Sequence, residues 1–146
     1  MELHYEPAME SDAEMIFKQC KSLVDAYETV SDIDYQGVLA WIFRKIKENI
    51  ESYTKVICDG KTVGYYFLRA VGDKLELDDF YVLEEYRGRG IGSVVLQDCL
   101  RDINQTVFLY VFVKNTGAIR LYRRYGFQKV KDVGSTRWIM ERNPDK

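Results

Sequence analysis

The chain has 146 residues, a formal net charge of −2, 47% hydrophobic residues and 14% aromatic residues. This length suits one core, so we expect residues 1–146 to form a single domain. The charge balance disfavours broad nucleic-acid binding, which needs many Lys and Arg side chains against phosphates. No apolar run approaches the ~18 residues of a membrane span. Because of the charge balance and the short apolar runs, neither a nucleic acid nor a membrane is an expected partner.

The cysteines and the histidine bear on metal binding and on the cellular setting. Cys20, Cys58 and Cys99 are far apart in the sequence, and His4 is the one histidine. An odd number of cysteines without a C-x-x-C pair disfavours a zinc site and a disulfide scaffold. We therefore expect no metal and a reducing, cytoplasmic setting. Residues 1–6 lack the basic and apolar stretches of a secretory signal, which agrees with that expectation.

The first third of the chain combines one strand pattern with two helical patterns. Residues 3–6 predict a short strand. Ser11 and Glu14 form a capping-box signature, which predicts a helix whose apolar residues recur at helical spacing as far as Tyr27. Residues 31–34 offer several N-cap candidates. A second amphipathic helix is expected over residues 38–50.

The rest of the chain alternates strands and helices. Residues 53–58 and 62–70 predict a hairpin around Asp59 and Gly60, and residues 75–82 predict a further strand. A loop over residues 84–90 leads into a helix from Ile91. Residues 107–113 are almost wholly apolar or aromatic, which favours a central strand covered on both faces. A last helix is expected to end at Gly126, before strands over residues 127–130 and 137–140.

This order of elements, β-α-α-β-β-β-α-β-α-β-β, predicts an α/β fold. We expect a single mixed, mostly antiparallel sheet of about six to seven strands, flanked by about four helices. The pattern contains no linker, internal repeat or low-complexity tract.

The loop before the third helix has the chemistry of an anion-binding site. It consists of Arg87, Gly88, Arg89, Gly90, Ile91, Gly92 and Ser93. Backbone N–H groups at a helix N-terminus attract anions, glycines permit close approach, and arginines add charged donors. The dinucleotide fingerprint is not met, because Ser93 stands where its third glycine belongs, and no P-loop Gly-Lys-Ser/Thr exists. A tight turn with solvated arginines is the alternative.

Two separate blocks resemble the GNAT acetyltransferase superfamily. The first is Arg87-x-x-Gly90-x-Gly92, preceded by residues 82–86. The second consists of Asn115, Ala118, Ile119, Leu121, Tyr122, Gly126 and Phe127. The resemblance implies the GNAT-like acetyltransferase fold and an N-acetyltransferase that moves an acetyl group from acetyl-CoA to a primary amine by direct attack in a ternary complex. The amine would belong to a small molecule, a peptide terminus or a lysine.

The resemblance also implies roles for individual residues. Loop residues 87–93, with Tyr81, Val82 and Asn115, would bind acetyl-CoA. Tyr122 would protonate the leaving thiolate, which suits a phenol with an ordinary pKa of about 10. From the residues alone, Asn115 is equally a plain N-cap and Tyr122 a core aromatic.

The strand before the loop contains an irregularity. Apolar residues occupy odd-numbered positions up to Leu77 and even-numbered positions from Phe80, so the alternation shifts by one residue across Asp78 and Asp79. A β-bulge explains the change, and a strand buried on both faces near its end is the alternative. The resemblance also implies that the strands on either side of the loop and its helix part like a V, with the pantetheine arm of the cofactor in the gap.

Three carboxylates in this strand are candidates for the general base. Several relatives, polyamine acetyltransferases among them, carry Glu-Asp where this chain has Asp78 and Asp79, so the resemblance points to Asp78. Aspartate is one methylene shorter, so a relaying water would be needed. Glu76 and Asp79 are the other candidates, and a solvated edge carboxylate is the alternative for Asp78.

The acceptor is not specified by the sequence. The aromatic residues that would form a wall for a cationic amine, or serve as core or rim packing, are Tyr27, Tyr35, Trp41 and Trp138. Two other functions fit the same chain: a non-catalytic CoA-binding or sensory module with a structural Tyr122, and an interaction domain whose loop binds a phosphorylated partner. The sequence is also compatible with a homodimer.

Overall fold

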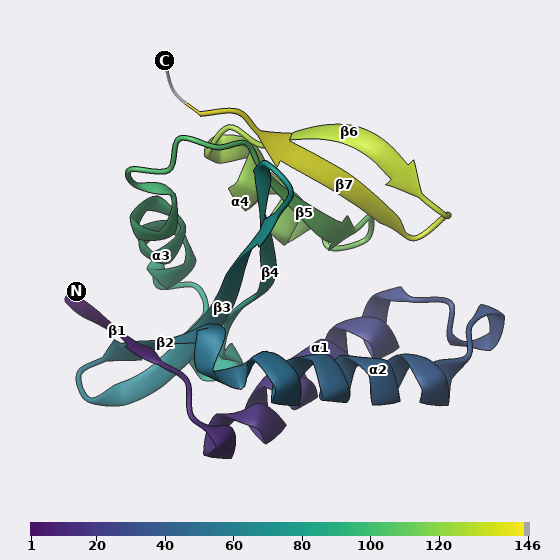
Figure 1. The fold of residues 1–146 in the computed structure, drawn as a ribbon, viewed down its shortest axis with the longest axis horizontal. Helices are drawn as coiled ribbons and strands as arrows, with labels where there is room; N and C mark the ends of the chain where they lie inside the picture. Colours follow the sequence, from purple (N-terminus) through teal and green to yellow (C-terminus); the bar gives the residue numbers. More distant parts are fainter. Residues whose placement is uncertain (145–146) are drawn as a thin grey trace. The chain divides into compact units, whose positions relative to one another are not determined.

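The computed structural model describes residues 1–144, which form an α/β fold of seven strands and four α-helices (Figure 1). The strand order is β1-β2-β3-β4-β5-β7-β6. The β4–β5 pair is parallel, whereas β1–β2, β2–β3, β5–β7 and β6–β7 are antiparallel. The predicted mixed, mostly antiparallel sheet with about four helices is therefore confirmed.

The described chain divides into two compact units. The N-terminal unit comprises Met1–Phe67 and Asp79–Leu83. The C-terminal unit comprises Leu68–Asp78 and the described residues from Glu84 onward. Strands β3 (Lys61–Val71) and β4 (Lys74–Val82) contribute residues to both units, and β4 passes from one to the other between Asp78 and Asp79.

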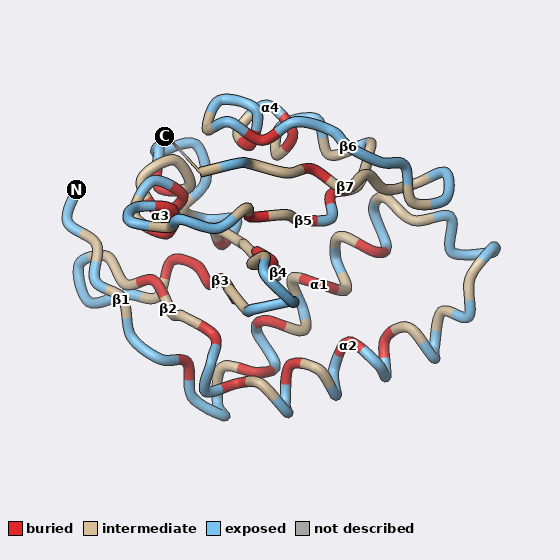
Figure 2. Tube along the Cα trace, turned by 45° about the horizontal axis from the view of Figure 1, so that its top comes forward, coloured by how far each residue is buried: buried red, intermediate tan, exposed pale blue. Residues whose placement is uncertain are grey.

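In the N-terminal unit, two amphipathic helices pack on each other. The elements are β1 (Leu3–Pro7), α1 (Ala13–Tyr27), α2 (Tyr35–Asn49) and β2 (Tyr53–Cys58). Buried residues recur every three or four positions along both helices (Figure 2): Ala13, Ile16, Cys20, Val24, Leu39, Ile42 and Ile46. This spacing gives each helix one apolar stripe, as its sequence predicts.

The two helices begin differently. The Asp34 side chain accepts a hydrogen bond from the Gly37 N–H at 3.2 Å, so α2 has one of the predicted caps. The capping box predicted at Ser11 is wrong, because Ser11 lies inside a 3₁₀ turn, Glu10–Asp12, that precedes α1. The Asp12 carboxylate instead accepts hydrogen bonds from the Met9 N–H and the Tyr65 hydroxyl, so it holds the incoming chain rather than α1.

In the C-terminal unit, helices α3 (Ile91–Leu100) and α4 (Thr116–Arg124) accompany β5 (Val107–Phe112), β6 (Gln128–Val133) and β7 (Arg137–Arg142). Strand β5 is central, as predicted, because it pairs with both β4 and β7. Full cover on both faces is wrong, however, because burial alternates along β5 and Tyr110 is 46% exposed. The exposed Tyr110 ring has the Arg137 guanidinium 5.5 Å away, so aromatic and cationic side chains form this face.

Helix α4 ends as its sequence predicts. Gly126 has a φ of 95°, a left-handed conformation that glycine adopts without a Cβ penalty. The Phe127 N–H then donates to the Tyr122 carbonyl at 3.1 Å, and Phe127 is buried.

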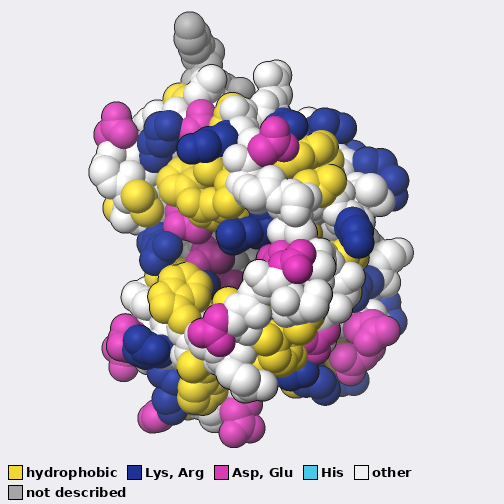
Figure 3. All heavy atoms as spheres, turned by 90° about the vertical axis from the view of Figure 1, so that its right-hand side faces the viewer, with side chains coloured by type: hydrophobic (Ala, Val, Ile, Leu, Met, Phe, Trp, Pro, Cys, Tyr) yellow, Lys and Arg dark blue, Asp and Glu magenta, His cyan; other side chains and the backbone are white. Residues whose placement is uncertain are grey.

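The surface carries both signs of charge. On the face drawn in Figure 3, Lys and Arg side chains are interspersed with Asp, Glu and hydrophobic side chains. Within residues 1–144, no helix is long and apolar enough to cross a membrane.

Candidate cofactor and catalytic site

The glycines before α3 hold the backbone in a left-handed conformation. Gly88 has a φ of 77° and Gly90 a φ of 79°, and Gly90 is the N-cap of α3. A Cβ added at either glycine would meet no atom within 4 Å. The start of α3 therefore borders open space, which a phosphate group requires in order to reach the N–H groups of the first turn.

The other residues of the loop differ in their burial. Ile91 is buried and fixes the first turn of α3 in the core, while Gly92 and Ser93 beside it are half-buried. Arg87 and Arg89 are exposed. The Arg89 guanidinium folds back along the loop, donating to the Glu85 carbonyl at 3.2 Å, with its carbon 5.5 Å from the Tyr86 ring. The loop thus combines open N–H groups with exposed cations, and these residues fit a pyrophosphate.

Asn115 and Tyr122 both belong to α4 or its cap. The Asn115 side chain accepts a hydrogen bond from the Ala118 N–H at 3.4 Å, so the N-cap role is present. Tyr122 is buried, and its ring meets the Phe127 ring edge to face at 5.7 Å. These contacts fix the position of the phenol, whether or not it also takes part in chemistry.

Tyr122 and Asp78 interact electrostatically within the C-terminal unit. Burial raises the pKa of the Tyr122 phenol well above its ordinary value, and the negative charge of Asp78 raises it further. Cys99 contributes in the same direction. The phenol therefore stays protonated across the physiological range, with a carboxylate near enough to affect its ionisation.

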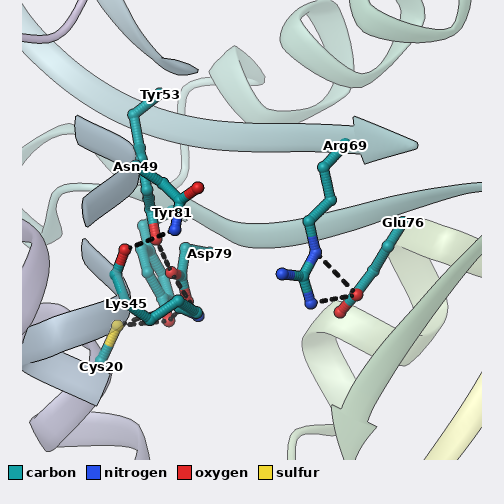
Figure 4. Close-up of polar contacts among 8 residues, drawn as sticks. All are labelled: Cys20, Lys45, Asn49, Tyr53, Arg69, Glu76, Asp79 and Tyr81. Carbon is teal, nitrogen blue, oxygen red and sulfur yellow. Dashed lines mark hydrogen bonds and ion pairs between the residues drawn. The ribbon is translucent and has the colours of Figure 1, made fainter. Parts of the chain in front are cut away.

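Glu76 is tied to an arginine. Its side chain is buried, and Oε1 accepts hydrogen bonds from the Arg69 Nε at 3.1 Å and Nη2 at 2.7 Å (Figure 4). An arginine fork of this kind stabilises the ionised carboxylate. Glu76 is thus held in an ion pair with Arg69.

Asp79 is also engaged, in a separate set of contacts within the N-terminal unit. Its carboxylate forms an ion pair with Lys45 at 2.9 Å and accepts hydrogen bonds from the Tyr53 and Tyr81 hydroxyls and the Cys20 thiol (Figure 4). Burial opposes the ionisation of Asp79, but the Lys45 charge and these hydrogen bonds leave its pKa below the ordinary value. Sequence reasoning anticipated an irregular strand here, but it missed Lys45, Tyr53 and Cys20 as partners.

Tyr81 and Val82 follow at the end of β4, and both are half-buried. The Tyr81 hydroxyl donates to Asp79 at 3.1 Å and lies 3.3 Å from the Cys20 sulfur. The hydroxyl of Tyr81 is therefore committed to the contacts of Asp79.

Three of the four aromatic residues considered for an acceptor wall have contacts or exposure that the structure defines. Tyr35 donates to the Asp25 carboxylate at 2.6 Å, and Trp41 is exposed. Trp138 belongs to the other unit, where the Lys129 ammonium lies 4.7 Å from its ring centroid. In the part of the chain that the structure describes, no group of three or more His, Cys, Asp or Glu side chains is arranged to hold a metal ion.

Curated relatives share parts of the sequence. Spermine/spermidine N(1)-acetyltransferase from Bacillus subtilis is 37% identical over 57 residues, 36% of this chain and 38% of that protein. N-alpha-acetyltransferase from Sulfurisphaera tokodaii is 31% identical over 103 residues, 59% of this chain and 62% of that protein. The chain thus spans less than two thirds of the length of either relative.

Solved structures share the whole fold. The PaiA N-acetyltransferase from Thermoplasma acidophilum, in complex with coenzyme A, matches with a TM-score of 0.73 at 20% identity, covering 98% of this chain and 99% of that one. Ard1 from Thermoplasma volcanium matches with a TM-score of 0.71 at 23% identity, over the full length of both chains. At these identities the likeness concerns the fold.

The family is given by a direct match between the sequence and a family model. The model for the acetyltransferase (GNAT) family matches residues 16–127, which include the α3 loop, Asp78, Asn115 and Tyr122. This segment is well over half of the chain, and it covers both sequence blocks whose geometry is described above. The chain therefore belongs to the acetyltransferase (GNAT) family.

Proposed function

We propose that this protein is an acetyl-CoA-dependent N-acetyltransferase that passes the acetyl group to a primary amine by direct attack in a ternary complex. The observation that carries the proposal is the loop before α3, where Gly88 and Gly90 hold a left-handed backbone beside open space at the helix N-terminus, in the same unit as the buried phenol of Tyr122 and the carboxylate of Asp78. Membership of the GNAT family supports the same reaction.

The α3 loop would bind the pyrophosphate of acetyl-CoA. N–H groups of the first turn, around Gly92 and Ser93, donate to the phosphates, and Arg87 and Arg89 add charged donors. Asn115 uses its side-chain oxygen for the cap of α4, so its amide nitrogen is the group that would donate to the cofactor arm. The family resemblance also implies a cofactor-binding role for Tyr81 and Val82. Acetyl-CoA itself supplies an acetyl group activated as a thioester.

The reaction needs one acid and one base. The acceptor arrives as an ammonium ion and gives a proton to Asp78, directly or through one water, and Asp78 later releases it to solvent. The neutral nitrogen attacks the thioester carbon, so a C–N bond forms and the C–S bond breaks. Tyr122 donates its phenolic proton to the departing sulfur, and the second proton of the nitrogen returns to the Tyr122 phenolate, directly or through water, which restores the phenol. The products are an N-acetyl amine and coenzyme A.

The other two carboxylates of β4 fit the role of base less well. Glu76 shares two hydrogen bonds with Arg69, and Asp79 has a lowered pKa and several donors. The lowered pKa of Asp79 makes its carboxylate a weak proton acceptor, and the Glu76 carboxylate is occupied by the Arg69 guanidinium. The charge of Asp78 contributes to the raised pKa of Tyr122, which supports the proposal of Asp78 as the base that works beside this acid.

The names of the relatives suggest which amines to test first. One relative is named for spermine and spermidine and another for N-alpha-acetylation. We propose a polyamine or a peptide N-terminus as the acceptor, with a lysine side chain as a third class. The three cysteines are unpaired, which suits a reducing compartment such as the cytoplasm.

The test is release of free CoA from acetyl-CoA in the presence of spermidine, an unblocked peptide and a lysine-containing, N-terminally blocked peptide. We expect amine-dependent release with at least one of them, and a raised melting temperature with acetyl-CoA alone. Stabilisation by acetyl-CoA without release for any amine would favour a non-catalytic CoA-binding or sensory module. No stabilisation by acetyl-CoA would contradict both functions and favour an interaction domain.

A further inference from the structure

Asp79 has an unusual backbone conformation for its position. Its φ is 48°, in the left-handed region, and it lies inside β4. The other non-glycine residues of positive φ within residues 1–144, Asp59 and Asp102, lie in turns, where this conformation is ordinary. A left-handed residue with a Cβ is disfavoured, and it persists in a strand only where its surroundings impose it.

The surroundings of Asp79 supply that constraint. Its carboxylate is contacted by residues from three other elements: Cys20 of α1, Lys45 of α2 and Tyr53 of β2, and also by Tyr81 of β4 itself. We call these five residues the Asp79 cluster. The cluster ties the bend in β4 to both helices of the N-terminal unit (Figure 4).

The cluster is well shielded from solvent. Only 6% of the Asp79 side chain and 10% of the Lys45 side chain are exposed, and Tyr53 is fully buried. A charged pair in such a setting is screened little by water or salt, so its geometry is strongly held. The Asn49 amide donates to the Lys45 carbonyl at 2.8 Å, which adds a contact beside the end of α2.

The bend affects the residue before it. In a regular strand, successive side chains point to opposite faces. A left-handed residue interrupts that alternation, so the conformation of Asp79 helps to set the direction in which Asp78 leaves the strand. Asp78 is the carboxylate whose charge reaches Tyr122.

We propose that Asp79 is a positioning residue, and that the Asp79 cluster holds the bend in β4 that aims Asp78 at its place beside the acceptor amine. This inference rests on the proposed function, because Asp78 is the base only if the chain transfers acetyl groups. Asp79, Lys45 and Tyr53 would touch no reacting atom. They act through the backbone of β4.

The first test compares two buried tyrosines. Tyr53→Phe removes a hydroxyl from the Asp79 cluster. Tyr65→Phe removes a hydroxyl that donates to Asp12, which also pairs with a lysine, Lys55. We expect Tyr53→Phe to lower kcat by roughly 5- to 20-fold with the acetyl-CoA Kd unchanged, and Tyr65→Phe to leave both within about twofold. Equal rates for Tyr53→Phe and the wild type would overturn the proposal.

A double-mutant cycle identifies the route of the effect. If Tyr53 acts through Asp78, its substitution has no further effect on kcat, to within about twofold, once Asp78→Asn has removed the base. A general loosening of the fold would instead lower kcat by the same factor in both backgrounds, and that result would overturn the proposal. The cycle thus separates positioning of the base from stability.

A spectroscopic measurement tests the bend without relying on activity. We expect the NMR couplings and carbon shifts of Asp79 to report a left-handed backbone in the wild type and to lose that signature in Lys45→Met and Tyr53→Phe. A retained signature in both folded variants would overturn the proposal, even if no amine proved to be a substrate. Failure of the wild type to acetylate any amine would count against the proposed function instead, and the bend would still be decided by this measurement.

Discussion

Gly90 and Asp79 share a left-handed backbone but have opposite surroundings. Gly90 has a φ of 79° and open space where a side chain would be. Asp79 has a φ of 48° and a side chain enclosed by a lysine, two tyrosines and a cysteine. The first conformation is available at no steric cost because glycine lacks a Cβ, whereas the second must be maintained by contacts.

The difference indicates how the two regions contribute to function. The space beside Gly90 is open, so a substitution there should weaken ligand binding more than it lowers the stability of the fold. The space around Asp79 is filled by its cluster, so a substitution in the cluster should lower the stability of the fold or the reaction rate while ligand affinity is preserved. Similar effects of substitutions in the two regions would contradict this distinction.

The largest stability effect is expected at Lys45. Lys45→Met leaves the buried Asp79 carboxylate without its ion-pair partner, which we expect to lower the free energy of unfolding by about 3–5 kcal/mol. Lys47→Met is the control on the same helix, because Lys47 pairs with Glu10 on the surface and should contribute about 0–1 kcal/mol. Urea unfolding at pH 7 measures both. Similar losses for the two variants would mean that the Asp79 cluster does not hold the fold as described.

A smaller effect, dependent on pH, is expected at Asp79 itself. The folded pKa of Asp79 is lowered, so its charge stabilises the fold above the unfolded pKa of about 3.9, and this contribution is lost as the pH falls through the folded value. Asp79→Asn keeps a residue that tolerates the left-handed conformation. We expect it to cost about 1.5–3 kcal/mol at pH 7 and clearly less near the acid end of the folded range. A pH-independent cost would show that the charge is not what matters.

The smallest stability effect is expected at Gly90. Gly90→Ala introduces a Cβ at positive φ and should cost about 1–2 kcal/mol. Gly60→Ala is matched to it, with a φ of 77° and the same open surroundings in the β2–β3 turn. Both variants should lose similar stability, but only Gly90→Ala should weaken acetyl-CoA binding, by about tenfold or more in isothermal titration. Equal acetyl-CoA affinity in the two folded variants would contradict the assignment of the α3 loop as the pyrophosphate-binding site.

The sequence predicted most elements because their signals are local. Helical periodicity identified α1 and α2, glycine turns identified the hairpin and the end of α4, and the parity change identified an irregularity at Asp79. The Asp79 cluster could not be predicted, because Cys20 and Asp79 are 59 positions apart and Tyr53 and Asp79 are 26 apart. Nothing local distinguishes a lysine on α2 that reaches a buried carboxylate from one that reaches solvent.

Two other features escaped prediction for a similar reason. The sequence pointed to a capping box at Ser11, whereas the structure uses Asp12 to accept from Tyr65, a residue 53 positions away. The apolar pattern of β5 does not reveal that the face bearing Tyr110 lies partly open, because exposed aromatic residues and buried ones look the same in sequence. Asp78 and Tyr122 were predicted from their resemblance to family blocks, and the structure adds that one acts electrostatically on the other.

The most direct test of the proposed reaction is the turnover of Tyr122→Phe, with Tyr125→Phe as its control in the adjoining turn. We expect Tyr122→Phe to reduce kcat for the preferred amine by roughly 10²- to 10⁴-fold, because the thiolate loses its proton donor, while the acetyl-CoA Kd stays within about twofold. Tyr125, whose hydroxyl accepts from Gln97, should be replaceable with little loss of kcat. A Tyr122→Phe protein that keeps the wild-type kcat would contradict the assignment of Tyr122 as the acid and would leave it with a structural role in the core.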